Sequence, residues 1–331
     1  MAKVRVGIIG TGGMAQEHVR RLRRCPDAEI AALCDIRQEA LDNTVKRWED
    51  LDKVPQFDDF RKMIDAVDLD GVAIVTPHTV HYEQIIACLD HGLNVISEKP
   101  MVCTVKHAHN VLDKIEQTGK VFVLAYQRHY EPEFLYVRDM IARGDIGRVE
   151  FVQGLQCQDW LRSQVGQWRQ DPALSGGGQL NDSGSHLLAV LLFCSGLGVE
   201  RVSAFIDNMG TRVDIDSAMT LEFVGGAKGN ISVVGSSPTW HEDLTIWGEE
   251  GVCFMRDNKL QICDGKGKRF RPRADQLPEG TDPDANFVEA ILGRAEVGSQ
   301  AVWGLRVIEL TEAAWKSAAS GHVETVDRSG R

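Results

Sequence analysis

The sequence has no segment that could cross a membrane or direct secretion. None of its 331 residues belongs to a run approaching the roughly 18 uncharged apolar residues that a membrane-spanning helix needs. The N-terminal apolar run is short and ends at Gly10, whereas a signal peptide has a longer apolar core and a cleavage site of small residues. We therefore expect a cytoplasmic protein with no membrane partner.

The sequence also lacks the CxxC spacing that is typical of zinc and redox sites. A chain of this length can bury a large core without disulfides or metals. Most of its cysteines have apolar neighbours, so we expect them to be reduced and buried as small hydrophobic side chains. The eight cysteines are Cys25, Cys34, Cys88, Cys103, Cys157, Cys194, Cys253 and Cys263.

The sequence has fewer basic residues than acidic residues. Lysine and arginine number 37 against 48 acidic residues, which gives a net charge of −11. Nucleic acids and anionic membranes bind basic surfaces, so we expect neither as a partner. The hydrophobic content of 43% and charged content of 26% are those of an ordinary globular protein, which argues against disorder. At about 150 residues per domain, the length predicts two domains.

The first 125 residues alternate between two periodicities. Short apolar runs rich in β-branched residues predict strands that are buried on both faces. Helical patterns separate them, so we expect βαβ units that form a parallel, doubly wound α/β sheet. The predicted strands are residues 4–9, 30–34, 72–75, 94–97 and 121–125, and the predicted helices are 14–24, 38–48, 57–66, 80–91 and 105–118.

The pattern changes after about residue 145. Several runs there alternate apolar and polar residues, as in an antiparallel sheet with one covered face. We therefore expect a separate α+β domain, with helices at 180–195 and 301–320 and a long polar surface loop at 264–285. Its predicted strands are residues 149–156, 200–206, 217–223, 229–234, 244–247 and 252–255.

A G-x-G-x-x-A motif occupies residues 10–15, between the first predicted strand and helix. Gly10 permits a tight turn, Gly12 lets the backbone approach a pyrophosphate, and Ala15 keeps helix and strand close. The helix N-terminus that follows offers free N–H groups to phosphates. In this context we expect a dinucleotide site rather than an ordinary glycine-rich turn.

An acidic residue marks the end of the second predicted strand. Asp35 lies 20 residues after Ala15, where a carboxylate accepts hydrogen bonds from the adenosine ribose and repels a 2′-phosphate. This favours NAD as the cofactor. Arg37 keeps NADP open, because an arginine there could bind the extra phosphate or simply be a solvated helix-start residue.

Two further segments follow predicted strands, and ligands of doubly wound sheets bind beyond the carboxyl ends of strands. The first is Thr76-Pro77-His78 with His81 three residues on, and the second is Glu98-Lys99-Pro100. The two histidines have no third metal ligand nearby, so we expect no metal. The proline restricts Lys99 and permits a cis peptide, which would direct the ammonium toward the cleft.

A glycine run leads into the first helix of the second domain. Asp182 and His186, four residues apart, are expected to share one face of that helix. A histidine near a carboxylate and a lysine can act as a general base near neutral pH. The alternative is a helix-capping aspartate and a packed core histidine. Trp160, Trp168 and Arg169, in the preceding loop, could line a sugar site or simply pack the loop.

Taken in this order, the motifs resemble those of the glucose–fructose oxidoreductase/inositol dehydrogenase family, also called Gfo/Idh/MocA. The resemblance covers nearly the whole chain and includes Gln127-Arg128, the glycine run through His186, and a last helix at residues 305–321. Members often carry an aspartate where this chain has Ala189 and a second arginine where it has His129. The missing acid puts sugar specificity in doubt rather than the chemistry.

The resemblance implies an NAD(P)-binding Rossmann domain at residues 1–125. It also implies a C-terminal α+β domain at 126–331, whose large open, mainly antiparallel sheet serves substrate binding and assembly into a homodimer or homotetramer. By analogy, Lys99, Asp182 and His186 are catalytic. The expected cofactor contacts are Gly10, Gly12, Gly13, Met14, Asp35, Arg37, Thr76, Pro77, His81, Glu98, Lys99 and Gln127. The expected substrate contacts are Lys99, Arg128, Trp168, Arg169, Asp182 and His186.

The hypothesis for function is NAD(P)-dependent oxidation of a secondary alcohol on a sugar, sugar derivative or cyclitol. His186 would take the hydroxyl proton and Lys99 would stabilise the charge on the reacting oxygen. Two alternatives remain open: a redox-neutral glycosidase that oxidises its sugar only transiently, and a non-catalytic nucleotide-binding regulator.

Overall fold

The computed structural model describes residues 3–328 and divides into two compact units. Unit 1 runs to Val102 and adds Lys106–Gln127 and Thr281–Val302, whereas unit 2 comprises Cys103–Val105, Arg128–Gly280 and the chain from Trp303 onward. The units therefore differ from the two contiguous domains predicted at 1–125 and 126–331, because the chain returns to unit 1 before it ends in unit 2.

The returning segment is anchored by helix α10 (Pro283–Ile291). Asp282 caps this helix, accepting hydrogen bonds from the backbone N–H groups of Asp284 and Ala285. The buried ring of Phe287 packs so closely on the first sheet that a Cβ at Gly71 would lie 2.8 Å from it. The sequence prediction placed the start of α10 in a surface loop, because a short helix in a polar, proline-containing stretch has little periodicity.

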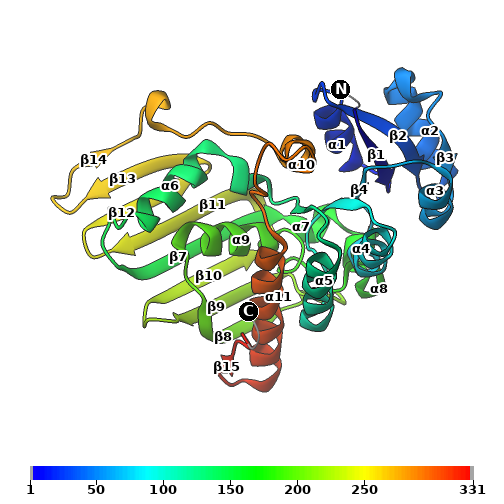
Figure 1. Ribbon diagram of the computed structural model, residues 1–331. Helices are drawn as coiled ribbons and strands as arrows, with labels where there is room; N and C mark the ends of the chain where they lie inside the picture. The colour runs from blue at the N-terminus through cyan, green and yellow to red at the C-terminus, as the bar shows by residue number, and fades with distance from the viewer. Residues whose placement is uncertain (1–2, 329–331) are drawn as a thin grey trace. The chain divides into compact units, whose positions relative to one another are not determined.

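Unit 1 contains a six-stranded sheet in the order β3-β2-β1-β4-β5-β6, and every neighbouring pair is parallel. This is the predicted doubly wound Rossmann sheet, and its order reverses direction between β1 and β4, where such folds bind ligands. The strands are β1 (Val4–Ile9), β2 (Ala28–Cys34), β3 (Gln56–Phe57), β4 (Gly71–Ile74), β5 (Asn94–Ser97) and β6 (Phe122–Leu124). The linking helices are α1 (Ala15–Leu22), α2 (Gln38–Arg47), α3 (Phe60–Ala66), α4 (His81–Asp90) and α5 (Val105–Thr118) (Figure 1).

Unit 2 contains a nine-stranded sheet in the order β14-β13-β12-β11-β7-β10-β9-β8-β15. Only the central pair β7 and β10 is parallel, so the sheet is mainly antiparallel, as predicted. The strands are β7 (Val149–Asp159), β8 (Val199–Asp207), β9 (Asp216–Phe223), β10 (Lys228–Val234), β11 (Ser236–Gly248), β12 (Gly251–Arg256), β13 (Lys259–Asp264), β14 (Arg269–Phe270) and β15 (Glu324–Thr325).

Three long helices cover one face of this sheet: α6 (Pro132–Ala142), α9 (Gly184–Ser195) and α11 (Ala301–Ser320) (Figure 1). The remaining α-helices in the described part of unit 2 are the short α7 (Trp160–Ser163) and α8 (Pro172–Ser175). α9 packs between the sheet and α6 and is apolar almost all round, as expected of a helix enclosed on every side. Helix α11 is joined to the sheet through Ser317, whose hydroxyl accepts a hydrogen bond from the Ala204 backbone at 3.0 Å.

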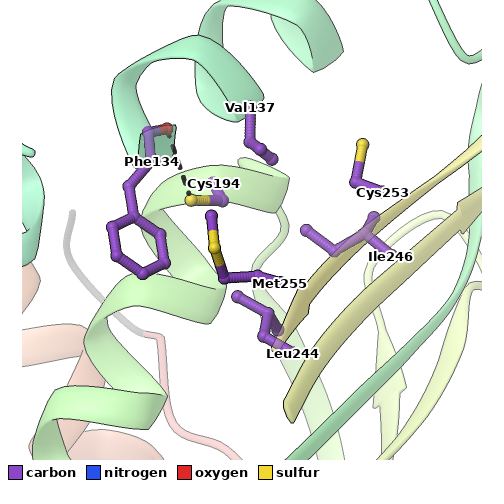
Figure 2. A pocket seen from close by; sticks show the side chains of 7 residues that line it. All are labelled: Phe134, Val137, Cys194, Leu244, Ile246, Cys253 and Met255. Atoms are coloured by element: carbon purple, nitrogen blue, oxygen red, sulfur yellow. Dashed lines mark hydrogen bonds between the residues drawn. The ribbon is translucent and has the colours of Figure 1, made fainter. Parts of the chain in front are cut away.

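A small cavity between α6, α9 and the strands β11 and β12 is a packing gap (Figure 2). Its volume is about 10 Å³, whereas small-molecule sites measure several hundred Å³. Its walls offer a ligand little polarity, and the Cys194 thiol already donates to the Phe134 carbonyl at 3.6 Å. The lining residues are Phe134, Val137, Cys194, Leu244, Ile246, Cys253 and Met255.

The sequence prediction missed several elements and misplaced several boundaries, most of all the start of β11, which lies at Ser236 rather than at residue 244. β3, β14 and β15 have two residues each, too few to show periodicity, while α6 and β13 are longer and were missed as well. The helix predicted at 180–195 begins only at Gly184. Among the helices of residues 3–328, none combines the length and apolarity that a bilayer crossing requires.

Candidate active site

The glycine-rich turn between β1 and α1 is tightly packed on one side and open on the other. Gly10 has φ +89°, and a Cβ there would lie 2.6 Å from the Val75 carbonyl oxygen at the end of β4. A Cβ at Gly12 or Gly13 would meet nothing within 4 Å. The turn therefore needs glycine at position 10 and leaves open backbone ahead of the N-terminus of α1, which fits a pyrophosphate.

Asp35 holds this turn from the end of β2. One carboxylate oxygen accepts hydrogen bonds from the backbone N–H of Thr11 at 2.8 Å and from its hydroxyl at 3.2 Å. The other oxygen accepts from the Arg37 backbone N–H at 2.9 Å. Each carboxylate oxygen has two lone pairs, so the oxygen that accepts only from Arg37 can still accept a hydrogen bond from a ribose hydroxyl. The Arg37 side chain is largely exposed, with its Nε 3.8 Å from Asp35.

Ile36 is a candidate that the sequence analysis missed. Its side chain is 87% exposed although it lies between Asp35 and Arg37 at the end of a buried strand. An apolar side chain held in solvent beside an acid that is expected to bind the ribose can pack against an adenine ring. The signal was present in the sequence, as an isoleucine directly after the strand-ending acid.

His81 is fully buried in unit 1, within the segment that follows β4. Its Nδ1 lies 2.9 Å from the Pro100 carbonyl oxygen and its Nε2 lies 2.9 Å from the Thr76 carbonyl oxygen. The histidine therefore joins the chain segments that leave β4 and β5, and its cofactor contact stays a prediction. Burial lowers the pKa of His81. Residues 3–328 contain no cluster of three or more metal-ligating side chains that could include His78 and His81.

Glu98, Lys99 and Pro100 leave the carboxyl end of β5. The Glu98 side chain is buried, and one of its oxygens accepts a hydrogen bond from the Lys99 backbone N–H at 3.1 Å. The Lys99–Pro100 peptide is cis, one of the two geometries expected from the sequence. The Lys99 side chain is half-buried. The segment is thus fixed at its backbone and leaves the lysine partly accessible.

In unit 2, Asp182 is held by the loop that precedes it. The same carboxylate oxygen accepts from the Trp160 indole N–H at 3.0 Å and from Arg169 Nε at 2.9 Å. The Arg169 guanidinium lies 4.5 Å from the centre of the Trp168 ring. Trp160 and Arg169 therefore position Asp182, while substrate contacts of Trp168 and Arg169 stay predictions.

His186 differs from every other residue of α9. The other residues of this helix, from Gly184 to Ser195, are all buried, whereas His186 keeps partial exposure. It is therefore not a packed core histidine. Asp182 precedes the helix, so the predicted shared helical face is wrong. Asp182 is not the cap either, because Ser183 holds the N-cap position without a side-chain hydrogen bond.

Asp214, a further residue that the sequence analysis missed, positions the glycine run before Asp182. Its carboxylate accepts from the backbone N–H groups of Gly178 at 2.9 Å and Leu180 at 2.7 Å, and from the Trp315 indole at 3.1 Å. A Cβ at Gly178 would lie 2.0 Å from the Asp214 carbonyl oxygen. No local motif announces this aspartate, which lies 36 residues from Gly178.

Gln127 and Arg128 open a 3-10 turn, Gln127–Tyr130, at the boundary between the two units. In unit 2, an Arg128 Nη atom lies 2.6 Å from the buried carboxylate of Glu242, which also accepts from the Gln156 amide at 3.2 Å. Arg128 is therefore committed to an internal ion pair, and its substrate contact stays a prediction. Gln127 is half-buried in unit 1.

Two family descriptions match the chain. Residues 4–126 match an oxidoreductase family with an NAD-binding Rossmann fold, and residues 134–253 match the GFO/IDH/MocA C-terminal domain. The chain belongs to the Gfo/Idh/MocA family. Unit 1 therefore carries an NAD-binding Rossmann fold.

Curated relatives cover most of this Gfo/Idh/MocA chain. The rhizopine catabolism protein MocA of Rhizobium meliloti is 29% identical, covering 95% of each chain. The scyllo-inositol 2-dehydrogenase (NAD(+)) of Bacillus subtilis is 24% identical over 81% of this chain and 79% of its own. A solved levoglucosan dehydrogenase in complex with NADH has a TM-score of 0.88 at 21% identity, covering 98% of this chain and 99% of its own.

Both departures from the Gfo/Idh/MocA pattern lie in the core of unit 2 and contact each other. The His129 ring stacks on Phe193 with centroids 4.1 Å apart, and it forms a hydrogen bond with the Ala189 backbone. Ala189 itself is 1% exposed. Ala189 lies in packed protein, and the effect of the missing acid on sugar specificity stays a prediction.

The glycine run gives a prediction for stability. Gly178→Ala should lower the free energy of unfolding by about 3 kcal/mol, because the new Cβ collides with backbone rather than with a flexible side chain. Gly13→Ala, which places its Cβ in open space, is the matched control and should change stability by less than about 0.5 kcal/mol. Urea unfolding of the two variants checks this, and equal stabilities would contradict the packing described.

His129 gives a prediction for the pH dependence of stability. Burial lowers its pKa to about 3, against about 6.5 when unfolded. The contribution of neutral His129 to the free energy of unfolding is complete above its pKa in the unfolded state. This contribution is lost as the pH falls from about 6.5 toward 3. Between about pH 7.5 and 5, the free energy of unfolding of the wild type should fall by about 2 kcal/mol more than that of His129→Phe. Urea unfolding at both values measures this, with exposed His322→Phe as control, and parallel losses in all three proteins would contradict it.

Proposed function

We propose that this protein is an NAD-dependent dehydrogenase acting on a secondary alcohol, or the corresponding ketone, of a sugar, sugar derivative or cyclitol. The observation that carries the proposal is His186, which alone keeps exposure on an otherwise buried helix and follows a fixed carboxylate, Asp182. Relatives named as scyllo-inositol and levoglucosan dehydrogenases support this substrate class.

We assign cofactor binding and substrate binding to different predicted domains. Residues 1–125 bind the cofactor, and residues 126–331 bind the substrate. We also expect a homodimer or homotetramer that associates through the sheet of unit 2. The 82% exposure of Phe205 on β8 supports this expectation, because a large apolar side chain in solvent favours contact with another protein surface.

Unit 1 has the groups that an NAD molecule needs. The backbone at Gly12, Gly13 and Met14 would hold the pyrophosphate, and Asp35 would accept from the adenosine ribose. Ile36 would pack against the adenine. The segments that leave β4 and β5 would border the nicotinamide half, with Gln127 beyond them. When bound, the nicotinamide supplies the hydride acceptor.

The chain's own residues would manage the proton and the charge. His186 would take the hydroxyl proton of the substrate as general base. Lys99 would donate a hydrogen bond to the reacting oxygen, whose negative charge grows as the hydride leaves. Asp182, already paired with Arg169 and Trp160, would orient substrate hydroxyls or the histidine.

Lys99 provides the direct test of this chemistry. Lys99→Met should lower kcat by at least about 100-fold, because a donor to the developing charge is lost. The dissociation constant for NADH should rise by less than about tenfold, because Lys99 is one cofactor contact among several and the turn and Asp35 are untouched. Lys106→Met, which removes an exposed lysine a few residues on, is the control and should keep wild-type kcat. A kcat of Lys99→Met near the wild-type value would contradict the proposed role of Lys99 in stabilising the charge on the reacting oxygen.

Asp35 gives the test of cofactor preference. Asp35→Asn keeps an acceptor for the Thr11 N–H but removes the charge that repels a 2′-phosphate. The ratio of kcat/KM for NAD over NADP should fall by about tenfold or more, equivalent to about 1.4 kcal/mol. Adding Arg37→Ser should reverse part of the gain for NADP. An unchanged ratio in Asp35→Asn would place the cofactor's ribose elsewhere.

A further inference from the structure

His18 is a buried histidine between two carboxylates, and the chemistry proposed above does not use it. It lies on α1, fully enclosed, one helical turn after the glycine-rich turn. Its Nε2 is 3.2 Å from a Glu98 carboxylate oxygen, and its Nδ1 is 2.7 Å from a carboxylate oxygen of Asp284 on α10. All three side chains belong to unit 1 and are buried.

The geometry determines the protonation of His18. A neutral imidazole has one N–H and one acceptor nitrogen, so it can donate to only one carboxylate. Both ring nitrogens of His18 face carboxylate oxygens, so the ring that satisfies both is the doubly protonated imidazolium. Burial alone would lower the pKa of His18. The charges and hydrogen bonds of Asp284 and Glu98 outweigh the effect of burial and raise this pKa to about 10.

The charges of this cluster balance. Two carboxylates, Glu98 and Asp284, meet the imidazolium of His18 and the guanidinium of Arg21, whose Nη1 lies 3.5 Å from Asp284. Four formal charges of alternating sign can remain in a low-dielectric interior, whereas removal of one leaves another uncompensated. The cluster is therefore a specific arrangement that withstands burial only when complete.

Glu98 passes this constraint to Lys99. One Glu98 oxygen pairs with His18, and the other accepts from the Lys99 backbone N–H. On the far side of Lys99, the Pro100 carbonyl contacts the buried ring of His81. The backbone around Lys99 is thus held from both sides by histidines that are themselves enclosed.

We propose that His18 is a positioning residue for the reaction, which fixes Glu98 and, through it, the backbone that directs the Lys99 ammonium. Because the glycine-rich turn leads directly into α1, which carries His18, α1 also joins the dinucleotide-binding turn to the Lys99 segment. This inference rests on the proposed function for the role of Lys99, whereas the positioning itself is a property of unit 1.

The first experiment measures turnover. His18→Gln should lower kcat by about 10- to 100-fold, because small misplacements of a catalytic group have effects of that size. The dissociation constant for NADH should stay within about threefold. His91→Gln, which removes an exposed histidine of unit 1, is the matched control and should keep wild-type values. Wild-type kcat in His18→Gln would overturn the inference.

The second variant, Asp284→Asn, weakens the hold on the His18 proton without touching Glu98. The pKa of His18 should fall from about 10 because the largest contribution that raises it is lost. The groups that contact His18 are then Glu98 and an uncharged amide, and Arg21 lies beside that amide. The kcat of this variant should be near wild type at about pH 6 and fall reversibly as the pH rises, a titration absent from the wild type. A merely destabilised protein would not show this reversible profile, and a profile parallel to wild type would contradict the proposal.

The third measurement needs no turnover. Reductive methylation with ¹³C-formaldehyde labels the lysines, and Lys99→Arg identifies the Lys99 resonance. His18→Gln and Asp284→Asn should move that resonance, whereas His91→Gln should leave it in place. If the wild type turned over no alcohol, the proposed function would fail while this spectrum still decided the positioning. If the Lys99 resonance did not move in either variant, the positioning role of His18 would be contradicted and His18 would serve the stability of the fold alone. If His18→Gln does not fold, the spectrum of Asp284→Asn alone tests the positioning role.

Discussion

The parallel arrangement of the six strands in unit 1 is the constraint on which the candidate site depends. In a parallel sheet every strand ends at the same edge, so residues far apart in sequence that follow strands are brought together there. Gly10 follows β1, Asp35 follows β2, and Glu98 follows β5. The order reversal between β1 and β4 opens this edge, and the lack of space for a Cβ at Gly10 beside the Val75 carbonyl shows how closely the two strand ends approach.

Buried and half-buried side chains with polar groups hold each functional segment, and each has its own partners. Asp35 holds the glycine-rich turn, and Asp214 holds the glycine run before Asp182. Trp160 and Arg169 hold Asp182, while His18 and His81 hold the segment of Lys99. An unpartnered polar group in such positions costs free energy, so these pairs restrict the backbone to one arrangement. A rigid backbone in turn restricts the directions in which the partly accessible side chains of Lys99 and His186 can point.

Much of the fold could be predicted because its signals are local. Strand β5 and helix α5 have the predicted bounds, since apolar runs and helical periodicity are properties of adjacent residues. The Gfo/Idh/MocA family was identified from motifs that occur in a fixed order along the chain. Helix α10 was missed because its anchor in unit 1 is a packing contact, invisible in a polar stretch.

Candidate site residues could be predicted only where a residue type carries its own chemistry. Lys99, Asp182 and His186 were singled out by charge and spacing, but the partners that fix them were not. His18 and Asp284 are 266 residues apart, and no local pattern joins them. The departures at His129 and Ala189 could be noted from the sequence, but their burial and their contact inside unit 2 could not be predicted from it.

The central claim is that this chain removes hydride from a carbinol carbon. The most direct measurement follows reduced nicotinamide by its absorbance while the wild type is supplied with NAD and a panel of sugars and cyclitols, one of them deuterated at the reacting carbon. The account predicts one reduced nicotinamide for each alcohol oxidised, formed more slowly from the deuterated substrate. No reduced nicotinamide with any alcohol, or cleavage of a glycoside without net reduction, would contradict it.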